Sequence, residues 1–272
     1  MQDLDNQFYY SWPFQGQLCN STTLSNIMNS LIELKNVTKK FGGITALKSA
    51  SLKMDKGEVV GLIGDNGAGK STLIKTLVGV YSPDSGEIFI RGEKIRGWTT
   101  AKAREAGIET VFQDRALCPQ QSIVWNIFMG KELKYPFGLI KEKKQIAEAN
   151  KLIREIGFTS ELIDAESPVG NLSGGERQGV AIARAIYNKA ELIILDEPTT
   201  ALSLMETQKV FDFVNNVKST GRSVLFIGHN IYHVYDISDR FILLDRGEVV
   251  HQLDKDDVRS PEELMKVMKA AV

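Results

Sequence analysis

The chain has little cysteine, no long hydrophobic run and no excess of charge of either sign. Among its 272 residues are two cysteines, Cys19 and Cys118, which are too few for a disulfide framework and lie in no CxxC pair. Because free thiols are typical of a reducing compartment, we expect a protein of the cytoplasm. The longest apolar runs, such as residues 59–64, fall far short of the ~18 residues that a spanning helix needs. The chain is therefore not expected to cross a membrane by itself.

The balance of charge excludes a further class of protein. Lysine and arginine number 33 and aspartate and glutamate number 34, which gives a net charge of −1 at pH 7. Proteins that follow the backbone of DNA or RNA usually carry a basic excess, so nucleic acid is not expected as a partner. No basic residue precedes Lys35, so the positively charged start of a secretory signal is also lacking.

Residues 1–30 differ in composition from the rest of the chain. They are rich in Gln, Asn, Ser and aromatic residues, and only Asp3 and Asp5 are charged. We expect a poorly ordered extension, or a start codon placed too early with Met28 as the true beginning. The alternative is that its aromatic residues dock on a partner; among them are Tyr9, Tyr10, Trp12 and Phe14. The folded domain is expected to span residues 31–272.

From residue 31 onward, short apolar runs alternate with helical stretches. Residues 31–34 and 51–54 have the pattern of strands near the edge of a sheet. Four later runs predict buried parallel strands that are covered on both faces, at residues 58–63, 192–195, 224–227 and 241–244. The sequence therefore predicts an α/β fold.

Helical segments are predicted in two further places. The strand pattern disappears between about Ala116 and Gly170, and residues 141–156 have the period of an amphipathic helix, so we predict a helical subdomain at about 116–172. Near the end of the chain, Ser260, Pro261 and Glu263 predict a helix start with a capping box. The charges that open the first helix fit a solvated face, with a membrane-surface role as the alternative; they are Lys141, Glu142, Lys143 and Lys144.

Residues 64–71 fit the phosphate-binding pattern GxxxxGK[ST] in the context that this pattern requires. A buried strand precedes the loop and a helix-like run, residues 72–77, follows it. The glycines allow backbone N–H groups to turn toward phosphate oxygens at the positive end of a helix. Lys70 would neutralise the β- and γ-phosphates, and the Ser71 hydroxyl would bind Mg²⁺. The predicted nucleotide-binding residues are Gly64, Asp65, Asn66, Gly67, Ala68, Gly69, Lys70, Ser71 and Thr72.

Two adjacent carboxylates, Asp196 and Glu197, follow the apolar run 192–195. Such a strand delivers them to the carboxyl edge of the sheet, where ligands of α/β proteins bind. We expect Asp196 to hold Mg²⁺, directly or through water. Glu197, whose side chain should point the other way along a strand, is expected to polarise the attacking water as a general base. Solvated acids at a strand end are the alternative, and the phosphate-binding loop upstream argues against it.

The segment Leu-Ser-Gly-Gly-Glu, residues 172–176, predicts a second helix start. Ser173 and Glu176 have the spacing of a capping box. The two glycines between them, Gly174 and Gly175, lower helix stability and expose N–H groups, which suits the binding of an anion. The chain would then hold two phosphate-binding helix N-termini, and this is economical only if each nucleotide touches both.

Together these motifs resemble the ATPase subunits of ABC transporters, over the chain from about Leu31 to the C-terminus. The resemblance implies ATP and Mg²⁺ as ligands and a P-loop core with a mixed, mainly parallel sheet, an N-terminal antiparallel β portion and a helical insertion. In that family the signature of one subunit caps the γ-phosphate of ATP on the P-loop of its partner. We therefore expect Ser173, Gly174 and Gly175 to act across a head-to-tail dimer with a second ATPase subunit.

The resemblance also implies roles for three single residues. Gln113 matches the glutamine that senses Mg²⁺ and contacts the transport channel, and His229 matches the histidine that contacts the γ-phosphate. Phe41 falls where an aromatic side chain stacks on adenine. The alternatives are a strand-end amide for Gln113, a core aromatic for Phe41, and a metal pair of His229 with His233. The expected catalytic residues are Glu197, His229 and Gln113, and the expected Mg²⁺ ligands are Ser71, Gln113 and Asp196.

The chain departs from the family pattern in two places. Ser203 stands where the family often has an aspartate after the catalytic glutamate, which puts the usual contact from that side chain across the dimer in doubt. Phe41 stands where the family often has tyrosine, so the aromatic face is kept and the hydroxyl is lost.

Several short segments are similar to those of monosaccharide importers of the ribose, xylose and fructose type: residues 41–43, 64–67, 197–203 and 228–230. The resemblance implies an integral membrane permease, an upstream solute-binding protein and a peripheral position on the cytoplasmic face of the cell membrane. Because the chain has one P-loop and no internal repeat, two copies, or one copy and a paralogue, must assemble. The alternatives are an importer of another solute such as branched-chain amino acids, a soluble ABC ATPase of nucleic-acid repair or translation, and a non-hydrolytic nucleotide-binding module.

Overall fold

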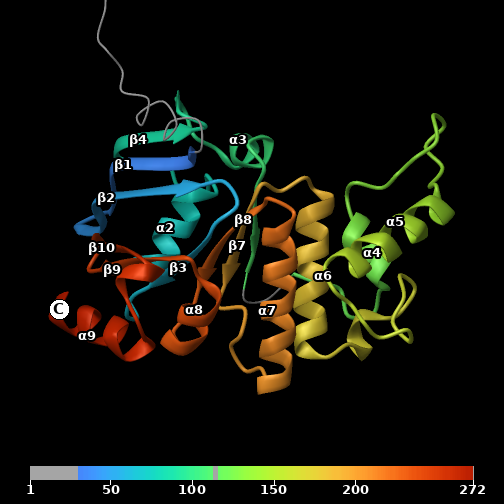
Figure 1. The fold of residues 1–272 in the computed structure, drawn as a ribbon. Coiled ribbons are helices and arrows are strands. Elements are labelled where there is room, and N and C mark those ends of the chain that lie inside the picture. Colours follow the sequence, from blue (N-terminus) through green and yellow to red (C-terminus); the bar gives the residue numbers. More distant parts are fainter. Residues whose placement is uncertain (1–29, 113–115, 272) are drawn as a thin grey trace, which may run out of the picture.

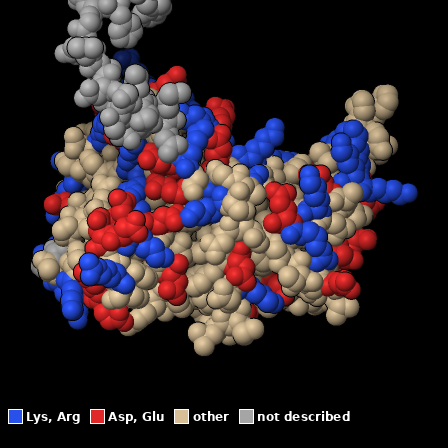
Figure 2. All heavy atoms as spheres, in the orientation of Figure 1, with Lys and Arg blue, Asp and Glu red and all other residues tan. Residues whose placement is uncertain are grey.

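The computed structural model describes residues 30–112 and 116–271, which form two β-sheets with helices around them (Figure 1). This is the α/β fold that the sequence predicts. The predictions for residues 1–29 and for Gln113 lie outside the described residues. On the face shown in Figure 2, acidic and basic side chains are interspersed, as expected for a chain with almost no net charge.

The smaller sheet is antiparallel, with the strand order β2-β1-β4-β5. Its strands are β1 (Ser30–Phe41), β2 (Ile44–Asp55), β4 (Ser85–Ile90) and β5 (Glu93–Ile95). The prediction that the first two strands lie near an edge is confirmed: β2 is the edge strand, and β1 lies beside it and pairs with β4 on its other side. A short apolar run shows that a strand is half buried and does not show how many neighbours it has.

The larger sheet has the order β10-β9-β3-β8-β7-β6, and only β10 runs antiparallel to its neighbour. Every residue of β3 and β8 is buried, as predicted for strands covered on both faces. The strands are β3 (Val59–Ile63), β6 (Ile108–Val111), β7 (Leu192–Asp196), β8 (Ser223–Ile227), β9 (Arg240–Asp245) and β10 (Glu248–Asp254).

Two hydrophobic cores lie on opposite faces of the larger sheet. Along β3, Val59 and Ile63 belong to one core and Val60 and Leu62 belong to the other, as the two-residue period of a strand requires. The smaller sheet and α2 cover one face, and α6 and α7 cover the other (Figure 1). The helices are α2 (Lys70–Leu77), α3 (Thr100–Glu105), α4 (Ile123–Phe128), α5 (Glu142–Glu155), α6 (Gly174–Tyr187), α7 (Leu204–Ser219), α8 (Ile231–Ile237) and α9 (Pro261–Ala271), with short 3₁₀ turns η1 (Val169–Asn171) and η2 (Lys255–Asp257).

The segment between β6 and α6 contains α4 and α5, which contact each other and α6. The amphipathic helix predicted at 141–156 is confirmed as α5. At the start of α9 the Glu263 N–H donates to Ser260 Oγ at 3.3 Å, while the Glu263 carboxylate accepts from the Arg259 N–H at 2.8 Å. The return bond of the predicted capping box therefore comes from one residue earlier in the chain. In the described ranges, no helix has both the length and the apolar character of a membrane span.

Candidate functional site

The loop between β3 and α2 is a tight turn whose glycines are required by its neighbours. Gly69, the residue before α2, has a left-handed φ of 106°, and a Cβ there would lie 2.8 Å from the carbonyl oxygen of Ala46. A Cβ on Gly64 would lie 2.3 Å from the carbonyl oxygen of Leu244 on β9. The turn is closed by a hydrogen bond from the Ala68 N–H to the Asp65 carbonyl at 3.1 Å. The strand–loop–helix context that the motif requires is therefore present.

Lys70 opens α2 and turns back into the loop. Its Nζ donates to the carbonyl oxygens of Gly64, at 2.6 Å, and Asp65, at 2.9 Å. Burial lowers the pKa of Lys70, and the charges of Glu197, Asp65 and Asp196 oppose that shift. The loop thus holds a buried ammonium group whose present partners are neutral carbonyls. Because phosphate oxygens are charged acceptors, they would bind this group more strongly than the carbonyls do.

The two predicted carboxylates lie at the end of β7, with different backbone conformations. Asp196 is the last residue of the strand, and burial together with the charge of Glu197 raises its pKa. Glu197 has already left the strand, with a φ of 51° and its N–H donating to the Ile227 carbonyl at 3.0 Å. The expectation that strand alternation orients Glu197 is therefore wrong, because a left-handed residue follows no strand period.

Both carboxylate oxygens of Glu197 are engaged. His229 Nε2 forms a hydrogen bond with Oε1, and the Thr200 hydroxyl donates to Oε2 at 3.3 Å. His229 follows β8, the strand beside β7, so two neighbouring strand ends bring the pair together. His233, one turn further on, contacts Thr199 Oγ1 at 3.1 Å through its Nδ1. The described residues contain no group of three or more His, Cys, Asp or Glu side chains suited to a metal, which does not support a His229–His233 metal pair.

An open pocket of about 510 Å³ joins the phosphate-binding loop to Glu197 and His229. Three of its lining side chains are basic, Lys48, Lys70 and Arg246, and among the described lining residues Glu197 is the one that is acidic. Its size and basic lining suit a polyphosphate. The sequence motifs missed Lys48 and Arg246, which come from β2 and the β9–β10 turn and carry no local pattern. The described residues that line the pocket are Ile44, Thr45, Ala46, Lys48, Asn66, Gly67, Gly69, Lys70, Ser71, Thr72, Glu197, His229 and Arg246.

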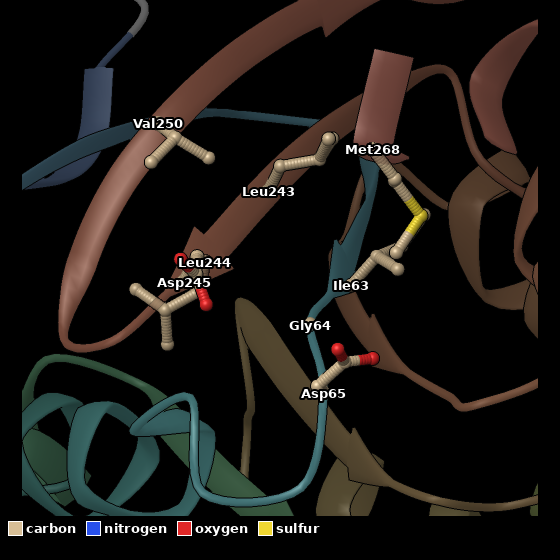
Figure 3. A pocket seen from close by; sticks show the side chains of 8 residues that line it. All are labelled: Ile63, Gly64, Asp65, Leu243, Leu244, Asp245, Val250 and Met268. Atoms are coloured by element: carbon tan, nitrogen blue, oxygen red, sulfur yellow. The ribbon is translucent and has the colours of Figure 1, made fainter. Parts of the chain in front are cut away.

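A second pocket lies behind the same loop and is too small for a nucleotide. Its volume is about 20 Å³, room for about one water molecule. Figure 3 shows Gly64 and Asp65 facing Leu244 and Asp245 of β9, with Met268 of α9 beside Ile63. This pocket therefore marks how closely β9 approaches the loop, and the ligand site is the larger pocket.

Phe41, the predicted adenine-stacking residue, is exposed over 42% of its surface and contacts the edge of Tyr81 with ring centroids 5.1 Å apart. It is therefore not a core aromatic. Within the described residues it does not line the larger pocket, although Ile44, three residues further on, does.

The signature segment lies at the start of α6, and its capping box is confirmed. The Glu176 N–H donates to Ser173 Oγ at 3.3 Å, and the Ser173 N–H donates to Glu176 Oε2 at 2.9 Å. The expected exposure of N–H groups is wrong for Gly174, whose N–H already donates to Glu206 Oε1 at 2.6 Å. A Cβ on Gly175 would lie 2.8 Å from the Glu206 carbonyl oxygen. The two glycines are therefore also required by the close packing of α6 against α7.

Glu206 connects the signature to the loop that follows Glu197. Its Oε2 accepts from the N–H of Ser203 at 3.0 Å and from its hydroxyl at 2.9 Å. These bonds, together with the one from Gly174, lower the pKa of Glu206. A second link between the same helices is the ion pair of Lys209 with Glu176, at 2.8 Å. The start of α7 thus holds both the loop that follows Glu197 and the signature.

The described residues that line the larger pocket do not include Ser173, Gly174 or Gly175. The structure therefore brings together the phosphate-binding loop, Glu197 and His229, and it leaves the signature outside their pocket. Gln113 falls in the undescribed residues 113–115, so its predicted place in the site is not described.

The sequence model of the ABC transporter family matches residues 47–200. The chain belongs to this family. The xylose/arabinose import ATP-binding protein of Sulfolobus acidocaldarius is 44% identical over 241 residues, which is 89% of this chain and 94% of that protein. A fructose import ATP-binding protein of Rhizobium meliloti is 38% identical over 77% of this chain and 83% of its own length. A ribose import ATP-binding protein of Escherichia coli O157:H7 is 38% identical over 86% of this chain, which spans only 46% of that relative.

Solved structures agree with this assignment. A nucleotide-free ATP-binding cassette from an ABC transporter superimposes with a TM-score of 0.74 at 25% identity, covering 88% of this chain and 95% of the cassette. A dimeric cassette in a post-hydrolysis state, bound to ADP and phosphate, gives a TM-score of 0.68 at 30% identity over 83% of this chain and 99% of its own. The resemblance predicted from the motifs is confirmed, and the chain is an ATP-binding ABC ATPase.

Proposed function

We propose that the chain is the ATP-hydrolysing subunit that energises the import of a monosaccharide through a separate membrane permease. The observation that carries this proposal is the basic pocket in which Lys70, Glu197 and His229 lie together. Relatives named for the import of xylose, fructose and ribose support a sugar as the transported solute.

ATP would bind with its phosphates against the loop that precedes α2. The N–H groups and helix N-terminus there favour negative charge. Lys70 would exchange its carbonyl partners for phosphate oxygens, and Lys48 and Arg246 would add positive charge at the rim of the pocket. Phe41 ends β1, and the turn after it leads to Ile44, which lines the pocket. We propose that Phe41 stacks on adenine.

The residues at the strand end fit a magnesium ion. Asp196 is a partly buried carboxylate whose pKa is raised by desolvation and by the charge of Glu197, so a cation beside it would offset both effects. Ser71, in the pocket lining, supplies a hydroxyl oxygen. Mg²⁺ is usually held by one or two carboxylates and by substrate phosphates, and this matches the absence of a larger acidic cluster in the described residues. We propose Ser71, Asp196 and Gln113 as its ligands; when bound, the ion neutralises charge on the phosphates.

Glu197 is proposed as the general base of hydrolysis. Its carboxylate lies in the pocket with Lys70, held by His229 on one oxygen and Thr200 on the other. Such a group can accept a proton from the attacking water, while His229 contacts the γ-phosphate. Because the hydrogen bonds fix the position of the carboxylate, proton transfer needs little rearrangement.

A complete site is proposed to need a second ATPase subunit. Ser173 and the glycines after it do not line the pocket of their own chain, so they are available to cap ATP on a partner arranged head to tail. The dimeric cassette among the similar structures supports this arrangement. The partner is either a second copy of the chain or a paralogue.

The proposed docking site for the permease is an open groove of about 420 Å³ between β6 and the helices α4 and α6. Two exposed apolar side chains in it, Phe112 and Met129, suit a short helical segment of a membrane protein. Gln113 follows Phe112 directly, so the groove begins where the proposed Mg²⁺ ligand lies in sequence. We further propose an upstream solute-binding protein and a peripheral position on the cytoplasmic face of the cell membrane.

The test of this function is a Glu197→Gln variant, which removes the base and keeps the size of the side chain. ATP binding by the purified variant should be unchanged, and hydrolysis should fall at least about a hundredfold. Cells carrying the variant in place of the native chain should lose uptake of a labelled monosaccharide from the set xylose, ribose and fructose. The control is Glu161→Gln, at an exposed loop position. Turnover close to wild type would contradict the general base, and unchanged uptake of all three sugars would contradict the proposed transport function.

A further inference from the structure

The connection between α4 and α5 forms an ordered hairpin, residues 133–141, that projects away from the body of the molecule (Figure 1). The Lys141 N–H donates to the Leu133 carbonyl and the Tyr135 N–H donates to the Leu139 carbonyl, both at 2.8 Å. At its base Leu133 packs against the hydrophobic core, and its N–H donates to the buried Gln145 at 2.8 Å. The hairpin is thus firmly attached, and its projection is built into the fold.

The tip of this hairpin is apolar and exposed. Phe137 is 94% exposed and Leu139 is 71% exposed, and Tyr135, in the first arm of the hairpin, is more than half exposed. Single exposed apolar residues are common, but three at alternate positions on one projecting tip form a patch that marks an interaction surface. Among the described residues, most of the surface of Phe137 and Leu139 stays uncovered.

Lysines lie within the hairpin and next to it in sequence, and one of them, Lys134, is paired with Glu132 at 3.4 Å. The Lys141 Nζ lies 4.9 Å from the centre of the Tyr135 ring, so its aliphatic stem lies along the hairpin. Figure 2 shows lysine and arginine atoms gathered at the base of the tan tip at the upper right. Residues 131–144 contain five lysines and two glutamates, in a chain with a net charge of −1; the lysines are Lys131, Lys134, Lys141, Lys143 and Lys144, and the glutamates are Glu132 and Glu142.

An apolar, aromatic-containing tip with lysines at its base is complementary to an anionic lipid surface. Aromatic and aliphatic side chains enter the headgroup region, and lysines reach lipid phosphates from long stems. The position agrees with this, because Met129, Gly130 and Lys131 line the proposed permease groove and the hairpin starts two residues later. We propose that the 133–141 hairpin binds the anionic headgroup surface of the membrane beside the permease. This assignment rests on the proposed function, which places the subunit at a membrane.

The test uses the purified full-length chain and lipid vesicles without any permease. Wild type should sediment with vesicles of phosphatidylcholine and phosphatidylglycerol, and not with vesicles of phosphatidylcholine alone. Phe137→Ser should weaken binding by about tenfold, and Lys143→Gln and Lys144→Gln by about fivefold each. Added salt should weaken binding of the wild type. The matched control is Leu162→Ser: Leu162 is 93% exposed on another loop of the same helical region, but lies between Glu161 and Asp164, and its loss should change nothing.

The ATPase rate measured on the same samples separates this proposal from the proposed function. The hairpin variants should hydrolyse ATP at the wild-type rate, since the hairpin does not line the nucleotide pocket. Failure of the wild type to bind anionic vesicles, or equal binding by the Phe137 and Leu162 variants, would overturn the hairpin proposal and leave the ATPase proposal intact. Hairpin variants that bind vesicles normally but lose binding to the detergent-solubilised permease would also overturn it, and would assign the hairpin to the permease.

Discussion

At the scale of single residues, Asp196 is expected to lower the stability of the nucleotide-free protein and to favour the binding of a cation. Its carboxylate is partly buried at the end of β7 beside Glu197, and both that burial and the neighbouring charge raise its pKa. A raised pKa means that the folded state prefers the neutral form of the acid. The ionised carboxylate therefore destabilises the nucleotide-free protein at neutral pH, and this effect is relieved as the pH falls through the pKa of the folded state.

This account predicts that Asp196→Asn makes the nucleotide-free protein more stable at neutral pH. The difference in unfolding free energy from wild type should shrink as the pH falls through the pKa of the folded state, and should vanish only below the unfolded pKa of about 3.9, where Asp196 is neutral in both states. Chemical denaturation over a pH series measures it. The same substitution should remove the extra stabilisation that Mg²⁺ gives in the presence of ATP. A variant less stable than wild type at neutral pH would show that Asp196 forms a compensating interaction.

At the scale of elements, the contact between the starts of α6 and α7 links the two functional segments of the chain. Glu206 accepts from Gly174 in the signature and from Ser203 in the loop after Glu197. Ser203 stands where aspartate is common in the family, and here it caps α7 with Glu206. The position of the signature therefore depends on the same carboxylate, that of Glu206, which holds the loop after Glu197.

Glu206→Ala should lower the turnover number severalfold and leave ATP affinity unchanged, because Lys70 and its loop are not touched. The matched control is Lys209→Met, which removes the other link between α6 and α7, the ion pair with Glu176. The Lys209 side chain of that pair is 44% exposed and the Glu176 side chain 15% exposed. Because solvent reaches the lysine, the pair is worth about 1 kcal/mol, and its loss should have little effect on turnover. Steady-state kinetics and nucleotide titration separate the two quantities. Equal turnover by the Glu206 variant and wild type would show that the signature is positioned without this carboxylate.

The sequence predicts local elements well where one residue pattern decides them. Buried parallel strands such as β3 and β8 are apolar throughout, and the capping box of α6 lies within four residues, so both are visible locally. The backbone conformation of Glu197 could not be predicted from the sequence, because its left-handed φ depends on the hydrogen bond to Ile227 of a neighbouring strand.

Contacts between segments that are distant in the chain could not be predicted from local sequence patterns either. Gly174 and Glu206 lie 32 residues apart, and the bond between them changes the interpretation of the signature glycines. Lys48 on β2 and Arg246 in the β9–β10 turn line the nucleotide pocket, and neither belongs to a sequence motif. Local sequence motifs therefore predict which residues have suitable chemistry for a site. The packing of the helices and strands decides which of those residues come into contact.

At the scale of the whole molecule, the central feature is that the phosphate-binding loop and the signature lie in separate places, although both are proposed to contact ATP. The phosphate-binding loop, Glu197 and His229 line one pocket, and Ser173 at the start of α6 does not belong to its lining. Two copies arranged head to tail would complete two sites, each built from the loop of one chain and the signature of the other.

The most direct measurement of this claim is ATP hydrolysis by mixed subunits. Ser173→Arg damages the signature and Lys70→Ala damages the phosphate-binding loop, so neither variant should hydrolyse ATP alone. Mixed and reassociated, the two should recover about a quarter of the wild-type rate, because random pairing makes about half the dimers mixed and each mixed dimer has one intact site of two. A mixture that assembles normally and hydrolyses no ATP would contradict the composite site.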